Sequence, residues 1–186
     1  GEVVDGIIAL IDNPEISIDE LITYVKGPDF PTGGIINGKQ GIYDAYRTGR
    51  GKLRVAGRVE IETSKTGKKS IIVTELPYQV NKSRLIEKIA DLVKQKKITG
   101  ISDLRDETDR DGIRVVIELK KGEESELILN SLYKFTDLQN TFGVIMLALV
   151  DNAPRVLNLK QVLQKYLEHR FEVITRRTEF ELKKAR

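Results

Sequence analysis

Between Ser70 and Val150, strand-like and helix-like patterns follow one another in the order β-α-β-β-α-β. This order limits the possible folds more than any other feature of the sequence. Elements connected in this way form a largely antiparallel sheet with its helices on one face. We therefore predict an α+β fold, a two-layer sandwich with a mainly antiparallel sheet.

The elements of this region are recognised by their periodicity and by the residues at their ends. Strands are expected at residues 70–76, 101–104, 113–119 and 139–150. Asn81 is a suitable N-cap for the first helix, and Gly100 is a suitable C-cap. Three carboxylates open the second helix, where the helix dipole favours them: Glu123, Glu124 and Glu126.

A further strand is expected before this region. From Lys52 to Glu62 small or apolar residues alternate with mostly charged ones, which is typical of a half-buried strand. Thr66-Gly67 marks a hairpin turn into the next strand. Arg54 and Arg58 are expected to share one strand face with Ala56, so that positive charge extends along the sheet.

The N-terminal part is predicted to contain two short helices. The first helical pattern stops at Asn13-Pro14, and Ser17 with Glu20 forms a capping box for the second helix. Five glycines and two prolines between Gly27 and Gly41 indicate an ordered, non-helical connection and a domain boundary.

The C-terminal segment is predicted to be one long helix. Asn158 is a suitable N-cap, with Gln161 three residues later, and the helical pattern continues to Arg186 without glycine or proline. About 29 residues at about 1.5 Å each make a helix roughly 40 Å long. A helix of this length extends beyond the predicted sandwich.

Composition excludes several classes of site. The sequence has no cysteine, so disulfides and thiolate metal sites are excluded, and its single histidine, His169, excludes a histidine-rich zinc site. No apolar run approaches the roughly 20 residues that span a bilayer, so no membrane partner is expected and a cytoplasmic location is the default. The net charge of +3, from 31 basic and 28 acidic residues, permits a polyanionic partner without demanding one.

The segment Tyr46–Lys52 combines two arginines and a lysine with two glycines. Such side chains and the glycine amides suit contacts to phosphate. A P-loop is excluded, because Tyr46 stands in place of its first glycine and Leu53 in place of Ser/Thr. The acidic residues between 103 and 111 lack the ligand spacing of an EF-hand and indicate a charged turn. These residues alone predict a soluble α+β binding module of unknown partner.

Six sequence strings, in order, carry a family resemblance. They are Gly27-Pro-Asp-Phe-Pro-Thr32, Ile35-Ile-Asn-Gly38, Ala45-Tyr-Arg-Thr-Gly-Arg-Gly-Lys52, Leu76-Pro-Tyr-Gln-Val-Asn-Lys82, Leu104-Arg-Asp-Glu-Thr-Asp109, and the tail from Asn158-Leu-Lys160 through Arg176-Arg-Thr178 to Glu181-Leu182. The chain thereby resembles the DNA-cleaving subunits of bacterial type IIA DNA topoisomerases. It resembles DNA gyrase more closely than topoisomerase IV.

The resemblance implies three parts of the chain. Residues 1–26 correspond to the end of a winged-helix region, residues 27–157 to the tower domain, and residues 158–186 to the start of a long coiled coil. The family's catalytic tyrosine is expected before Gly1, so no catalytic residue and no metal ligand is assigned here and the chain alone is expected to be inactive. In the whole enzyme, the B subunit of DNA gyrase is expected to supply ATP and Mg²⁺ binding, and the A subunit is expected to form a homodimer.

In such an enzyme the tower domain holds the outer arms of a bent duplex, the gate DNA. The residues expected to contact this DNA are Arg47, Arg50, Lys52 and Arg54, with Lys82 and Arg84 as weaker candidates. Two other interpretations stay open, the A subunit of topoisomerase IV and a non-enzymatic nucleic-acid-binding α+β module. A scaffold whose long helix docks a partner is a further alternative. A nucleic-acid-binding module of this topology normally has stacking aromatic residues on its central strands, and residues 113–119 contain none.

Overall fold

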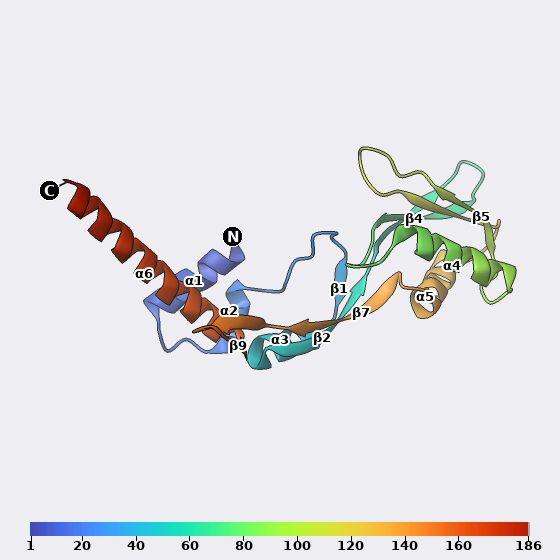
Figure 1. The fold of residues 1–186 in the computed structure, drawn as a ribbon. Coiled ribbons are helices and arrows are strands. Elements are labelled where there is room, and N and C mark those ends of the chain that lie inside the picture. Colours follow the sequence, from blue (N-terminus) through green and yellow to red (C-terminus); the bar gives the residue numbers. More distant parts are fainter. Residues whose placement is uncertain (186) are drawn as a thin grey trace. The chain divides into compact units, whose positions relative to one another are not determined.

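The structure is a computed structural model that describes residues 1–185, and Figure 1 shows its helices and strands. The helices are α1 (Glu2–Asp12), α2 (Ile18–Tyr24), α3 (Gln40–Thr48), α4 (Lys82–Lys94), α5 (Ser125–Phe135) and α6 (Leu159–Ala185). The strands are β1 (Ile35–Asn37), β2 (Arg50–Ala56), β3 (Arg58–Thr63), β4 (Lys69–Glu75), β5 (Ile101–Asp106), β6 (Val115–Leu119), β7 (Gln139–Ile145), β8 (Leu147–Val150) and β9 (Ala153–Val156). The predicted α+β class is confirmed.

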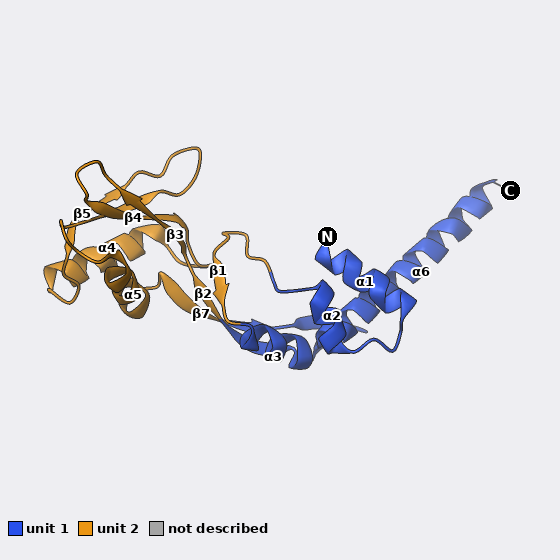
Figure 2. Cartoon of the chain, turned by 180° about the vertical axis from the view of Figure 1, so that it is seen from behind, with its two compact units in different colours: residues 1–28, 39–53, 143–186 blue, residues 29–38, 54–142 orange. Residues whose placement is uncertain are grey.

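The chain folds into two compact units, and neither is continuous in sequence (Figure 2). Unit 1 comprises residues 1–28, 39–53 and 143–186, and unit 2 comprises residues 29–38 and 54–142. Packing therefore divides the chain differently from the three sequence segments named above. The division into residues 1–26, 27–157 and 158–186 stays a prediction.

Unit 2 contains the predicted two-layer sandwich. Its sheet has the order β3-β4-β6-β5, all neighbours are antiparallel, and α4 and α5 cover one face (Figure 1). The side chains between the sheet and the helices are fully or nearly fully buried; they include Ile71, Val73, Ile89, Val115, Ile117 and Leu132. The consecutive buried apolar residues of β4 and β6 and the apolar stripe of α4 form this layer, and the predicted two-layer arrangement is confirmed.

The last strand of the predicted β-α-β-β-α-β order does not join this sheet. β7 belongs instead to a second, three-stranded sheet of order β1-β2-β7. The predicted single strand 139–150 is also wrong, because it is interrupted at Met146, whose N–H donates to the Gly49 carbonyl at 2.8 Å. β8 then pairs with β9 through a two-residue turn in which Asp151 and Asn152 both have positive φ, the geometry of a tight hairpin.

The predicted continuous strand from Lys52 to Glu62 is divided at Gly57. β2 lies in the three-stranded sheet and β3 in the four-stranded sheet. The Gly57 N–H donates to the Leu138 carbonyl at 2.7 Å, and a Cβ at this position would lie 2.7 Å from the Glu75 carbonyl oxygen. Only glycine permits this close approach. The expectation that Arg54, Ala56 and Arg58 share one face is therefore wrong.

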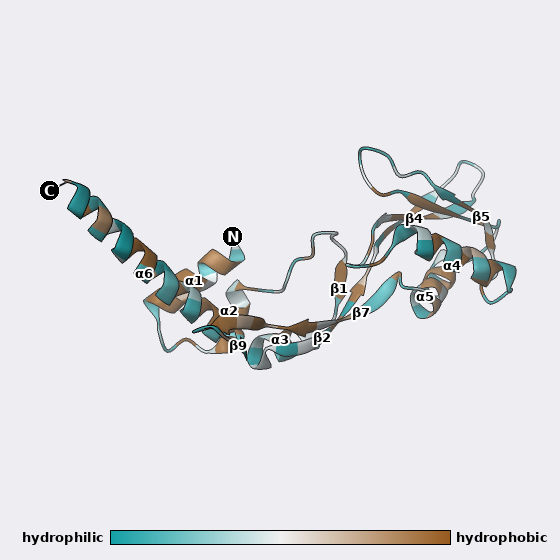
Figure 3. Cartoon of the chain, viewed as in Figure 1, coloured by the Kyte–Doolittle hydropathy of each residue, from teal (hydrophilic) through white to brown (hydrophobic). Residues whose placement is uncertain are grey.

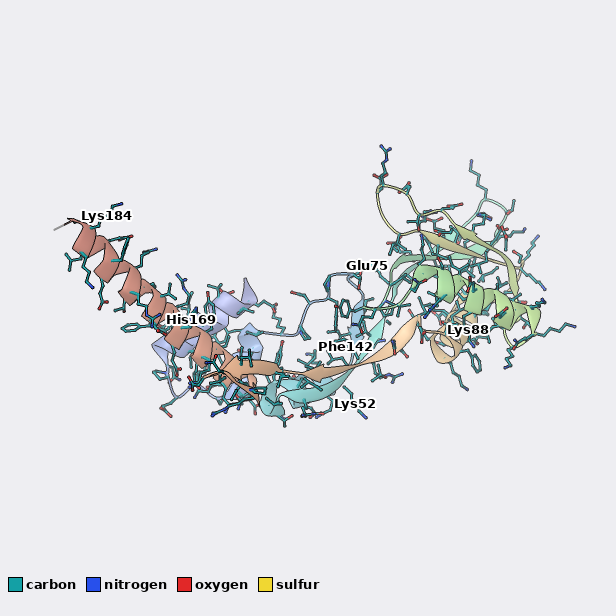
Figure 4. The ribbon with its side chains drawn as sticks, viewed as in Figure 1. Lys52, Glu75, Lys88, Phe142, His169 and Lys184 are labelled. Carbon is teal, nitrogen blue, oxygen red and sulfur yellow. The ribbon has the colours of Figure 1, made fainter. Side chains whose placement is uncertain are left out.

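The connection from Asp29 to Gly38 is ordered, as predicted, although it also contains the short strand β1. The Gly34 N–H donates to a Glu75 carboxylate oxygen at 2.6 Å, and this hydrogen bond lowers the pKa of Glu75. Phe30 also forms a cluster with Tyr78 and Phe142, whose ring centroids lie 5.0–5.8 Å apart; Glu75 and Phe142 are labelled in Figure 4.

The predicted helix starts are confirmed by their hydrogen bonds. Ser17 and Glu20 form the complete capping box of α2, and the Asn81 side chain accepts from the Arg84 N–H at 3.0 Å at the start of α4. Asn158 and Gln161 exchange backbone-to-side-chain hydrogen bonds at 2.8 and 2.9 Å before α6. The predicted end of α4 is wrong. The helix ends at Lys94 and Gln95 is its C-cap, while Gly100 with φ of 91° precedes β5.

The long C-terminal helix is confirmed as α6, a helix of 27 residues. Hydrophilic residues predominate along it, with apolar residues interspersed (Figure 3). Some of the apolar side chains are strongly exposed, such as Phe171 at 76% and Phe180 at 67%. The coiled coil stays a prediction. In the part of the chain that the structure describes, no helix is both long enough and apolar enough to cross a membrane.

Candidate nucleic-acid interface

Helix α3, which the sequence pattern did not predict, lies directly against β2. A Cβ on Gly41 would overlap the Lys52 carbonyl oxygen, and a Cβ on Gly51 would lie 2.8 Å from the Ala45 backbone nitrogen. Two glycines thus allow the backbones of α3 and β2 to touch. Ile42, Ala45 and Tyr46 form the buried side of the helix.

This contact determines which side chains of β2 face outward. Leu53 and Val55 are buried, whereas Arg50, Lys52 and Arg54 alternate with them and are exposed. Successive exposed cations on such a strand are about 6.6–6.8 Å apart. Arg50 and Lys52 belong to unit 1, and Arg54 belongs to unit 2; Lys52 is labelled in Figure 4.

The turn between α3 and β2 is held by backbone hydrogen bonds on both sides of the Gly49 peptide. Gly49 ends α3 in the left-handed conformation, with φ of 79°. Its N–H donates to the Ala45 carbonyl at 2.7 Å, and its carbonyl accepts from Met146. The Gly49 amide is therefore already used and does not contribute the phosphate contact that the sequence suggested.

Arg47 lies in the last turn of α3 and already has partners. Its guanidinium contacts the Asp19 carboxylate at 2.8 Å through both Nε and a terminal nitrogen, and it lies 5.5 Å from the ring centroid of Tyr43. These three residues line a cleft of about 540 Å³ together with Ile22, Thr23, Lys26 and Lys39. A phosphate that approaches Arg47 has to compete with Asp19.

Arg54 donates to the Gln139 side-chain oxygen at 2.9 Å. The two residues line a second cleft, of about 660 Å³, together with Asn37, Asn130, Tyr133 and Lys134. Of these six residues only Arg54 was singled out from the sequence. The others are distributed over three elements, and no local pattern connects them.

The two weaker candidates lie at the start of α4. The Lys82 ammonium is 2.8 Å from an Asp106 carboxylate oxygen, and this hydrogen bond, with support from Thr108, lowers the pKa of Asp106 to about 2. The Arg84 side chain is exposed. The backbone N–H of Arg84 donates to the side-chain oxygen of Asn81, the N-cap of α4. Lys82 is thus already paired, whereas Arg84 is directed to solvent.

The Lys82–Asp106 pair predicts a defined acid dependence of stability. The folded-state pKa of Asp106 lies below its ordinary value of 3.8, so the pair stabilises the fold above about pH 4 and this contribution is lost as the pH falls toward 2. We expect Lys82→Gln to be less stable than the wild type at pH 5, and the difference to be much smaller at pH 2, where about half of the Asp106 carboxyl groups are protonated. Urea unfolding at pH 5, 4, 3 and 2 measures this difference. Arg84→Gln is the control, and a Lys82→Gln difference that does not change between pH 5 and 2 would contradict the assignment.

Two other arginines of unit 2 are paired with several carboxylates each. Arg105 on β5 contacts Asp103, Glu107 and Glu118 at 2.7–3.3 Å, and Arg114 contacts Glu62 and Glu107 at 3.1 Å. Hydrogen bonds from these two arginines lower the pKa of Glu107, that from Arg114 most strongly. The acidic run is thus a charged turn with ion pairs, as predicted. Among residues 1–185 no group of three or more His, Cys, Asp or Glu side chains is placed to hold a metal ion.

Comparison with known proteins assigns the class of protein. The sequence model of the A subunit of DNA gyrase and topoisomerase IV matches residues 1–186, and the chain belongs to this family.

Among its relatives are the A subunits of DNA gyrase from several bacteria. The chain is 65% identical over 185 residues to that of Clostridium acetobutylicum, 60% over 188 residues to that of Pseudomonas aeruginosa, and 55% over 186 residues to that of Escherichia coli K12. Each comparison covers 100% of the chain and 20–22% of the relative. The resemblance seen in the six sequence strings is confirmed, and the chain spans about a fifth of the length of these relatives.

Proposed function

We propose that the chain is the part of the DNA-cleaving subunit of a type IIA DNA topoisomerase that holds duplex DNA beside the cleavage site. The observation that carries this proposal is the exposure of three cations of β2, Arg50 and Lys52 in unit 1 and Arg54 in unit 2. Among residues 1–185 none of the three has an ion-pair partner within 4.0 Å, in contrast to Arg47 and Lys82. Membership of the family supplies the context in which such cations meet DNA.

The spacing of these cations suits a phosphate backbone. Side chains two residues apart on a strand are separated by about 6.6–6.8 Å. Phosphates of one DNA strand advance by about 3.4 Å per nucleotide along the axis, so a strand that runs along the duplex offers one cation for every second phosphate. Contacts of this kind position DNA without reading its sequence. Bending a duplex costs a few kcal/mol, and contacts along its arms offset that cost.

The chemistry of strand cleavage belongs, in this proposal, to residues outside the chain. The family's Arg-Tyr-Thr motif does not occur in residues 1–186. Mg²⁺ and ATP are assigned to the B subunit of DNA gyrase. The complete assembly is proposed to be a cytoplasmic, ATP-dependent supercoiling enzyme with a homodimer of the A subunit, and the present chain is expected to bind DNA without cleaving it.

Fluorescence anisotropy with a labelled duplex of about 25 base pairs tests this function. We expect the isolated chain to bind duplexes of unrelated sequence with similar affinity. Because three phosphate contacts release counterions, the logarithm of the association constant should fall against the logarithm of salt concentration with a slope of about −2.7 or steeper. A single-stranded oligonucleotide of the same length is the control. No duplex binding at 50 mM salt, or clear preference for the single strand, would overturn the proposal.

A further inference from the structure

The 660 Å³ cleft of unit 2 differs from the 540 Å³ cleft around Arg47, which Asp19 lines, in having no acidic side chain in its lining. It is lined by two cations, Arg54 and Lys134, by the side-chain amides of Asn37, Asn130 and Gln139, and by the phenol of Tyr133. Four elements bring these residues together. β1, β2 and β7 provide the three residues of the sheet, and α5 provides the three others. An anion that enters this cleft therefore meets no carboxylate in its lining.

The hydrogen-bond donors of the cleft are largely unused. Of the five guanidinium N–H groups of Arg54, one donates to Gln139. This hydrogen bond orients the side chain and leaves the other donors available.

Lys134 on α5 is also available for a ligand. Its ammonium lies 5.4 Å from the ring centroid of Phe135, and no carboxylate lies within 4.0 Å of it among residues 1–185. Lys134 is in the last turn of α5, where the backbone carbonyls carry partial negative charge. A ligand should therefore contact the side chains of this turn rather than its backbone. Tyr133 is half-buried, and this burial raises the pKa of its phenol, so the hydroxyl keeps its proton and can donate.

We propose that this cleft binds a phosphate group, and that the group is a phosphodiester of the duplex. The inference rests on the proposed function for the choice of DNA, whereas the preference for phosphate rests on the donors alone. A guanidinium, an ammonium, three side-chain amides and a phenol in the lining of one cleft match an anion with several acceptor oxygens. The cleft adds Lys134, Tyr133 and Asn130 of α5 to the contacts along β2. Arg54 lines this cleft and is oriented by its hydrogen bond to Gln139, whereas Arg50 and Lys52 do not line it.

Lys134→Gln tests the cleft without touching the β2 cations, and Tyr133→Phe removes only the hydroxyl. Lys88→Gln is the matched control, because Lys88 is an exposed lysine on α4 outside the cleft and its replacement changes the net charge equally (Figure 4). In duplex anisotropy we expect Lys134→Gln to weaken binding by about tenfold and to reduce the salt slope by about 0.9. Tyr133→Phe should weaken binding by less, and Lys88→Gln should leave both quantities unchanged.

A second experiment distinguishes binding of free phosphate from binding of the DNA phosphodiester. The same proteins are titrated with inorganic phosphate, and ¹H–¹⁵N correlation spectra monitor the binding. Shifts at residues 130, 133 and 134 in the wild type that are lost in Lys134→Gln would support the phosphate site. If Arg50 and Lys52 variants weaken duplex binding while Lys134→Gln does not, the cleft inference is overturned and the proposed function stands. If free phosphate binds but the duplex does not bind the chain at all, the choice of DNA is overturned together with the proposed function. If neither phosphate nor DNA shifts these residues, the site itself is refuted.

Discussion

Reversing the charge of Arg50, Lys52 and Arg54 together, each to glutamate, is expected to lower the affinity of the chain for duplex DNA by on the order of 100-fold at 0.1 M salt. The physical reason is that three exposed cations on one strand face are replaced by three anions, so favourable phosphate contacts become repulsive. The loss of three contacts should also reduce the salt slope by about 2.7. Anisotropy titrations at four salt concentrations measure both effects.

The control for this variant must carry the same change in charge elsewhere. Lys65, Lys88 and Lys97 are exposed lysines of unit 2, and their joint replacement by glutamate alters the net charge equally. If affinity depends on net charge alone, both triple variants will lose binding to the same extent, and the interface on β2 is then refuted. Circular dichroism should show the same fold for both, because all six side chains are exposed. In a reconstituted gyrase, unchanged supercoiling by the β2 variant would also contradict the DNA-holding role.

Gly41→Ala is expected to destabilise the chain by about 1–3 kcal/mol and to lower the Tm by roughly 2–12 °C. Alanine is normally the better residue inside a helix, by about 0.5–1 kcal/mol over glycine. In α3 the added Cβ would overlap the Lys52 carbonyl oxygen, which is backbone and cannot rotate away as a side chain can. The helix therefore has to move away from β2. Thermal unfolding followed by circular dichroism measures the change.

Gly143→Ala is the matched control for this prediction. Gly143 lies in β7 with no atom within 4 Å of an added Cβ and no positive φ, so alanine should be neutral or slightly stabilising there. A Tm for Gly41→Ala that equals or exceeds that of the wild type would show that α3 does not pack on β2 in this way. The packing of α3 on β2 leaves the cations of β2 exposed on the outside. The Gly41→Ala protein should therefore also bind duplex DNA more weakly at temperatures below its Tm.

Features that depend on neighbouring residues were predicted well. The capping box of Ser17 and Glu20, the N-cap Asn81 and the pair Asn158–Gln161 each involve residues three apart, and all are present. The antiparallel arrangement and the helices on one face were also predicted from patterns along single segments, although the strand 139–150 was wrongly assigned to this sheet. Local side-chain chemistry and a regular period suffice for such elements.

Features that depend on contacts between distant residues were missed. Gly41 was assigned to the end of a non-helical connection, although it lies in α3 and permits this helix to touch β2. The alternation from Lys52 to Glu62 continues through Gly57 without a visible break, and the division appears only because Gly57 bonds to Leu138. The Asp151-Asn152 hairpin was readable in principle, since these residues favour positive φ in tight turns.

The α+β class, the helix caps, the long final helix and the family of this protein were predictable from the sequence, because each follows from residues close together or from strings matched in order. Which cations are available became visible in the folded chain. Arg47 and Lys82 are paired with Asp19 and Asp106, which are 28 and 24 positions away in sequence, and Arg54 meets Gln139 across 85 positions. The physical reason is that an ion pair or a cleft requires side chains to meet in space, and a sequence pattern records only their order along the chain.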